Sequence, residues 1–206
     1  MDHALILAEL LATRLCHDIS GPLNTVWGAL EEAGDPAAGS AESLALAQEA
    51  AEALVRRLQL LRAAWGGPGE MLTPEGLAQL AAGVPGPGIA LDCTGLAPET
   101  IFAPELGQLL LNLLILAGEA MPRGGRVAIA EAGADVLVLI ADGPRAAWPQ
   151  GLAAAIADLD ALGEVAPHQV QSVLCVLIAR RAGFALSFLM AAGTQAVPPL
   201  LIRRIG

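Results

Sequence analysis

The sequence predicts an α+β chain in two parts, an antiparallel helical hairpin followed by an α/β sandwich with helices on one face of a sheet. Over the first 66 residues, apolar residues recur every three or four positions, which is the period of amphipathic helices. Beyond residue 70, apolar helical runs are mixed with short runs that alternate as strands do. Between the two parts lies Gly66-Gly67-Pro68-Gly69, a typical linker, so we expect domains at 1–66 and 70–206.

Composition and charge limit the classes of function. The chain has 206 residues, 55% of them hydrophobic, and 21 acidic against 11 basic residues give a net charge of −10. A nucleic-acid partner is not expected, because binding to a phosphate backbone needs clustered Lys and Arg. The longest apolar stretch, 109–117, is too short to span a membrane, and the start lacks the basic region of a secretory signal. We therefore expect a cytoplasmic protein without membrane insertion. The three cysteines follow no metal-ligand spacing and are expected to be reduced thiols.

Each helix of the predicted hairpin carries an apolar stripe. The stripe of the first helix, over 4–30, contains Ala8, Leu11, Leu15, Ile19, Leu23, Val26 and Leu30. The stripe of the second helix, over 42–65, contains Leu44, Ala47, Ala51, Leu54, Leu58, Leu61 and Trp65. The charged residues that fall mostly outside this second stripe are Glu49, Glu52, Arg56, Arg57 and Arg62. One hairpin cannot cover both stripes, so we expect a homodimer with a four-helix bundle; packing on the chain's own second domain is the alternative.

The second part begins with a short helix, because Thr73 and Pro74 are a typical cap and first-turn residue. Further helices are expected near 104–120, 148–159 and 168–181. The expected strands are 89–93, 126–130, 136–140, 184–190 and 197–203.

One histidine of the first helix is predicted to face solvent. At about 100° per residue, His17 lies about 200° from Leu15 and so on the face opposite the stripe. Asp18 lies on the flank between His17 and the stripe. Pro22 removes a backbone N–H inside the helix and should bend it there.

The residues around His17 form a recognisable string. Residues 14–23 read Arg-Leu-Cys-His-Asp-Ile-Ser-Gly-Pro-Leu, with Pro at the fifth position after the histidine. This string resembles the H-box of the dimerisation and phosphotransfer helix of histidine kinases, and it is still more similar to the ChpT family of histidine phosphotransferases.

The order of elements in the second part resembles the ATP-binding domain of histidine kinases, but its motifs are incomplete. Asn112 matches the first Asn of the kinase helix, whereas Leu116 stands where a second Asn helps to hold magnesium. Asp142 matches the Asp that reads adenine, but Pro and Arg replace the glycines after it, and the second glycine-rich motif is missing. We therefore expect no ATP site. Asn112 is interpreted as a polar group at the domain surface, and Asp142 as a turn residue at a strand end.

The resemblance implies a phosphotransfer protein without ATP-dependent kinase activity of its own. His17 would take a phosphoryl group from one receiver-domain aspartate and pass it to another, with Asp18 or a neighbouring polar group as an acceptor for the second ring nitrogen. The residues expected to contact the receiver are Thr13, Arg14, Ser20, Gly21, Pro22 and Asn24. The implied partners are the receiver domain of a hybrid histidine kinase and the receiver domains of response regulators. No cofactor is expected in this chain, since the Mg²⁺ ion would belong to the receiver. Two alternatives stay open: an active histidine kinase that uses ATP, and a non-catalytic dimeric binding module.

Overall fold

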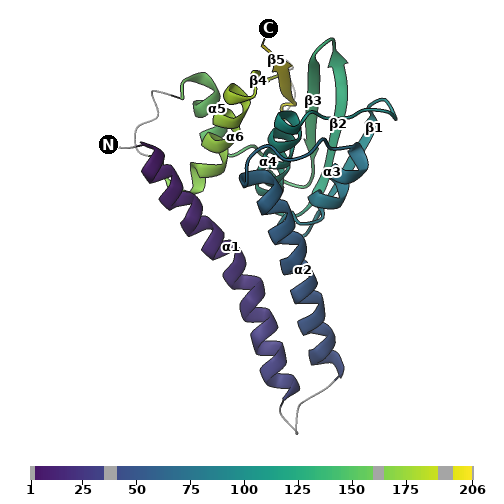
Figure 1. Cartoon of the computed structure of the whole chain (residues 1–206), viewed down its shortest axis with the longest axis vertical. Helices are drawn as coiled ribbons and strands as arrows, with labels where there is room; N and C mark the ends of the chain where they lie inside the picture. Colours follow the sequence, from purple (N-terminus) through teal and green to yellow (C-terminus); the bar gives the residue numbers. More distant parts are fainter. Residues whose placement is uncertain (1–2, 35–40, 160–164, 190–196, 206) are drawn as a thin grey trace. The chain divides into compact units, whose positions relative to one another are not determined.

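A computed structural model describes residues 3–34, 41–159, 165–189 and 197–205 of the chain (Figure 1). The chain divides into two compact units, Met1–Gln59 and Leu60–Gly206. The division falls within a helix, before the glycine-rich segment 66–69, so the last turn and a half of that helix belongs to the second unit.

The first unit is a helical hairpin. It contains α1 (His3–Ala33) and most of α2 (Ala41–Trp65), which run in opposite directions in Figure 1. The helix α1 continues through Pro22 without an interruption. Both helices were expected from the three-and-four spacing of apolar residues, and the structure confirms them. No helix among the described residues is long and apolar enough to cross a membrane.

The second unit is built on a mixed sheet. Its strands are β1 (Ile89–Gly95), β2 (Gly125–Gly133), β3 (Val136–Asp142), β4 (Phe184–Phe188) and β5 (Leu200–Arg204). In the described residues their order is β1-β2-β3-β5-β4, with β1 and β2 parallel and the other neighbours antiparallel. Every expected strand is present. The expected strand 184–190 ends at Phe188, and Met190 lies outside the described residues.

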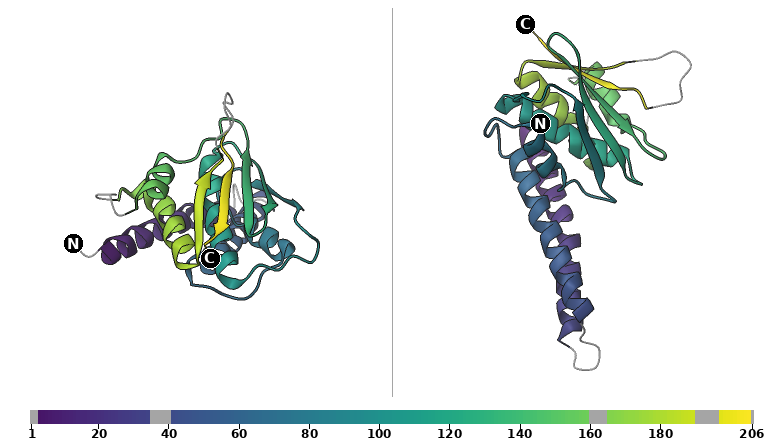
Figure 2. Two further views of the ribbon diagram at one scale, coloured as in Figure 1. Left: turned by 90° about the horizontal axis from the view of Figure 1, so that it is seen from above. Right: turned by 90° about the vertical axis from the view of Figure 1, so that its right-hand side faces the viewer.

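The helices of the second unit pack against one face of this sheet (Figure 2). They are α3 (Pro74–Ala81), α4 (Pro104–Ala120), α5 (Gln150–Ala157) and α6 (Val170–Arg181), with the short 3₁₀ helix η1 (Pro167–Gln169) before α6. The expected cap of α3 is confirmed, because the Thr73 hydroxyl accepts a hydrogen bond of 3.1 Å from the Gly76 N–H. The second unit is therefore the α/β sandwich that the sequence predicts.

The core of this unit is centred on α4. Its leucines from Leu109 to Leu116 are all at most 1% exposed, so the helix is buried on every side. The strands alternate, and Val127 and Ile129 of β2 turn their side chains into the same core. Leu116, which stands at the magnesium-binding position of the kinase resemblance, is fully buried here.

Candidate functional site

The imidazole of His17 is an accessible polar group in the middle of α1. Its side chain is 89% exposed, as the helical phase predicts. One turn further along α1, Gly21 is exposed, and a Cβ atom added there would meet nothing within 4 Å. The histidine therefore stands on an open helix surface, where its ring can be reached from outside the chain.

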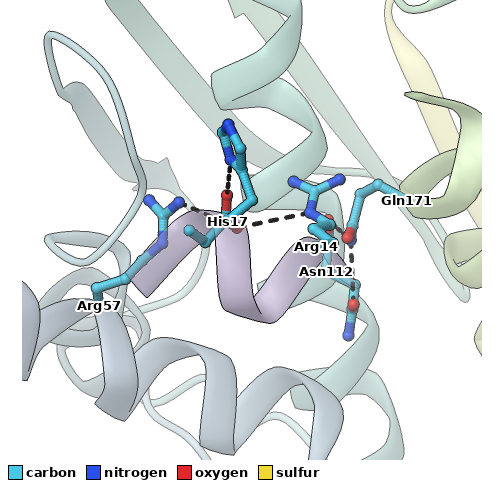
Figure 3. A network of polar contacts seen from close by, with 6 residues as sticks. Arg14, His17, Arg57, Asn112 and Gln171 are labelled. Carbon is cyan, nitrogen blue, oxygen red and sulfur yellow. Dashed lines mark hydrogen bonds and ion pairs between the residues drawn. The ribbon is translucent and has the colours of Figure 1, made fainter. Parts of the chain in front are cut away.

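Asp18 lies beside this imidazole and is nearly buried. Its side chain is 12% exposed, and Oδ1 is 3.5 Å from Nδ1 of His17 (Figure 3). The other carboxylate oxygen, Oδ2, is 3.1 Å from Nη2 of Arg57 and 3.6 Å from Nε of Arg14. Two guanidinium groups thus surround one carboxylate, which in turn contacts the exposed histidine.

Arg57 differs from the other charged residues of α2. It belongs to a group of charges expected to fall mostly outside the apolar stripe, but it is only 8% exposed. The sequence spacing indicates this burial. Arg57 follows Leu54 by three residues and precedes Leu61 by four, which is the spacing of the apolar stripe itself. Its neighbour Arg56 does face outward, with an ion pair of 3.7 Å to Glu52.

The other residues expected to contact a receiver differ in exposure. Thr13, Ser20 and Asn24 are exposed, and Pro22 is half-buried. The hydroxyl groups of Thr13 and Ser20 donate hydrogen bonds to backbone carbonyls one turn earlier in α1. Arg14 is set apart from this group, because its guanidinium points to Asp18 within the hairpin.

A second polar cluster lies in the second unit, around Asn112. The expectation that Asn112 sits at the domain surface was wrong, since the residue is 0% exposed. Its side-chain N–H groups donate to the carbonyl oxygens of Ala64 (2.7 Å) and Gln108 (2.9 Å), and its Oδ1 accepts from Nε2 of Gln171 (3.1 Å; Figure 3). The physical reason is that the last turn of α2 brings an unpaired helix-end carbonyl to α4, where a buried donor satisfies it.

Two glutamines complete this buried cluster. Nε2 of Gln108 also donates to the Ala64 carbonyl, at 3.0 Å, and Oε1 of Gln108 accepts from Nη2 of Arg181. Gln171 donates in addition to the backbone carbonyl of Asn112, at 3.0 Å. The amide of Asn112 is thus occupied by protein groups on both its nitrogen and its oxygen, in a place closed to solvent.

Another polar position of the kinase resemblance, Asp142, lies at the end of a strand. Asp142 is the last residue of β3 and is exposed, as expected of a strand-end turn residue. Among the residues that the structure describes, no three His, Cys, Asp or Glu side chains gather as metal ligands would. The cysteines Cys16, Cys93 and Cys175 are all free thiols.

Comparisons with known proteins agree with this arrangement. The family model for the histidine phosphotransferase C-terminal domain matches residues 91–194, about half of the chain. The protein phosphotransferase ChpT of Brucella abortus (strain 2308) is 28% identical over 189 residues, which cover 89% of this chain and 90% of that protein. A solved structure described as a bacterial phosphotransferase has the same fold, with a TM-score of 0.74 at 24% identity over 98% of this chain and 97% of that one. The chain therefore belongs to the histidine phosphotransferase family and is a ChpT-type protein.

Proposed function

We propose that this chain relays a phosphoryl group between receiver-domain aspartates through His17. Family membership supports phosphotransfer in two-component signalling as the general activity. The observation that carries the finer proposal is the pairing of a freely exposed imidazole with a nearly buried carboxylate at its Nδ1. A donor receiver and an acceptor receiver can each approach such a nucleophile from outside.

The reaction needs only the groups that this site presents. The lone pair of Nε2 attacks the phosphorus of the aspartyl phosphate, and the P–O bond to the aspartate breaks with its electron pair going to the carboxylate. The proton on Nδ1 stays in place, and Asp18 stabilises the positive charge that the ring acquires. The reverse attack by a second aspartate returns the phosphoryl group and restores the neutral imidazole. The main work of the helix is to hold the nucleophile in line.

In this proposal, the chain uses no cofactor of its own, and the magnesium ion and acidic pocket belong to the receiver domain. The partners are the receiver of a hybrid histidine kinase and the receivers of response regulators. The buried Asn112 and Leu116 support phosphotransfer over an ATP-dependent kinase reaction, because neither side chain can reach a nucleotide without the core opening.

A relay experiment tests the proposal. The chain is incubated with a receiver domain carrying labelled phosphate, and an unlabelled second receiver is then added. We expect acid-labile label to appear first on this chain, to map to His17 by mass spectrometry, and then to move to the second receiver. Label on His3 or His168, or transfer that bypasses the chain, would contradict the proposal.

We also propose that the hairpin forms a homodimeric four-helix bundle. Large apolar side chains remain exposed on both helices of the hairpin. On α1 they include Leu23, Trp27 and Leu30, and on α2 they include Leu44, Val55 and Leu58. Each set follows helical spacing along one face, so each helix offers an apolar stripe that a second copy can cover.

The proposed dimer can be tested at one exposed apolar position on each helix. Trp27 is 65% and Leu58 is 41% exposed, so replacing both by Glu should leave the hairpin intact and prevent association. Light scattering should give a dimer for the wild type and a monomer for Trp27→Glu with Leu58→Glu. A wild-type monomer at micromolar concentration would contradict the bundle.

A further inference from the structure

The guanidinium of Arg57 reaches from one helix of the hairpin to the carboxylate beside the nucleophile on the other. Arg57 belongs to α2, whereas Asp18 directly follows His17 in α1. Oδ2 of Asp18 is 3.1 Å from Nη2 of Arg57, and Oδ1 is 3.5 Å from Nδ1 of His17. The two oxygens of one carboxylate therefore face two different partners.

Of the two arginines, Arg57 holds Asp18 more closely. The Arg57 contact is 3.1 Å with side chains 10% and 12% exposed, whereas the Arg14 contact is 3.6 Å. A carboxylate turns easily about its last torsion unless one of its oxygens is fixed. An ion pair at 3.1 Å in a nearly buried place supplies that restraint.

We propose that Arg57 is a positioning residue for phosphotransfer. By holding Oδ2 of Asp18, it directs Oδ1 to Nδ1 of His17, which keeps the proton on Nδ1 and the reactive lone pair on Nε2. The proposal rests on the proposed function of His17 and adds to it a residue on the second helix that never touches the phosphoryl group. On this view, α2 sets the tautomer of the nucleophile as well as forming the bundle.

Arg57 also contributes to the net charge close to His17. Two guanidinium groups and one carboxylate leave one net positive charge under His17, in a chain whose formal net charge is −10. A positive charge close to an incoming phosphoryl group stabilises it, and it does so more strongly where water is partly excluded. Removing Arg57 would bring this local sum to zero.

The tautomer can be measured without any phosphotransfer. In the full chain with ¹⁵N-labelled histidine, the protonated and unprotonated ring nitrogens differ widely in chemical shift, and a His17→Gln sample identifies the His17 signals. We expect the Nδ1–H form to dominate in the wild type and to lose that dominance in Arg57→Met. The matched control is Arg56→Met, one position earlier on the exposed side of α2, which should leave the tautomer unchanged.

Transfer kinetics give a second readout. For a phosphorylated receiver, Arg57→Met should lower kcat about tenfold and leave KM within about twofold, because Arg57 is buried away from the receiver's approach. Arg57→Lys should recover part of the rate, since lysine restores the charge but not the planar fork. A merely structural role would instead lower the amount of folded protein, which circular dichroism measures separately.

A double-mutant cycle covers the case in which Arg57→Met loosens the hairpin. In an Asp18→Asn background, Arg57→Met should not change the tautomer further, because the contact is already lost. Additive effects of the two substitutions on the tautomer, or an Arg57→Met protein that matches Arg56→Met in both readouts, would overturn the inference. Absence of label on wild-type His17 would instead overturn the proposed function, and the tautomer measurement would still decide what Arg57 does to the imidazole.

Discussion

The two polar clusters of this chain differ in how accessible their polar groups are to solvent and to a partner. Around Asp18, ion pairs from two arginines hold a carboxylate, and the neighbouring imidazole stays 89% exposed. Around Asn112, the amide groups bond to one another and to the Ala64 carbonyl, all closed to solvent. A side chain can act on a partner only where a lone pair or proton is accessible. The first cluster is therefore suited to chemistry, and the second to stability.

The largest expected effect is the loss of phosphoryl acceptance when the nucleophile of the first cluster is removed. His17→Ala should lower phosphoryl acceptance from a receiver at least about a thousandfold, because no other described group can replace the imidazole on that face. The free energy of unfolding should change by less than about 0.5 kcal/mol, as for other exposed positions. Label uptake measures the phosphoryl acceptance, and urea unfolding measures the free energy of unfolding. His17→Gln, which keeps a polar surface, should behave in the same way.

Asn112→Leu should show the opposite pattern. The substitution removes the 2.7 Å hydrogen bond to the Ala64 carbonyl and leaves Gln171 without its side-chain acceptor. We expect a loss of about 1–3 kcal/mol in the free energy of unfolding, the usual cost of unsatisfied buried groups. Phosphoryl acceptance well below the melting temperature should stay within about twofold. Gln48→Leu, an exposed position on α2, is the control in urea unfolding, and an equal loss there would remove the contrast between buried and exposed amides.

A smaller effect is expected one turn from the nucleophile. A Cβ atom at Gly21 would meet no atom within 4 Å in this chain, and leucine favours a helix over glycine by about 0.5–1 kcal/mol. The protein should become slightly more stable, while the KM for the receiver rises about tenfold because the side chain obstructs docking. Gly28 lies on the same helix face, about 10 Å further along than Gly21, and Gly28→Leu should gain stability without this rise in KM. Equal KM values for the two variants would move the docking surface away from His17.

The smallest expected effect is a difference in thiol reactivity. Cys16 is exposed next to His17, whereas burial, helped by the charge of Asp92, raises the pKa of the half-buried Cys93. A raised pKa leaves less thiolate at pH 8, so Cys93 should be alkylated more slowly than Cys16 and should gain speed at higher pH. Cys175 is buried and should react only on unfolding. Mass spectrometry of timed samples gives the order, and early labelling of Cys175 would contradict the closed core of the second unit.

Features that depend on nearest neighbours along a helix or strand could be predicted from the amino-acid sequence. The period of apolar residues located both hairpin helices, and the phase of His17 against Leu15 predicted its exposure correctly. Thr73 and Pro74 located the start of α3 in the same local way. Such predictions succeed because backbone geometry fixes the direction of each side chain relative to its own element.

The contacts of the polar side chains in the interior could not be predicted in this way, because they depend on how distant elements pack. Asn112 meets the Ala64 carbonyl across 48 residues and Gln171 across 59, and Arg57 reaches Asp18 on the other helix. In each case, the local sequence predicts an exposed polar side chain. Burial of such a group requires a hydrogen bond or an opposite charge, and here the partner comes from a distant part of the chain. Helical phase places a side chain on a face, but the packing of the elements determines whether that face meets solvent or a partner.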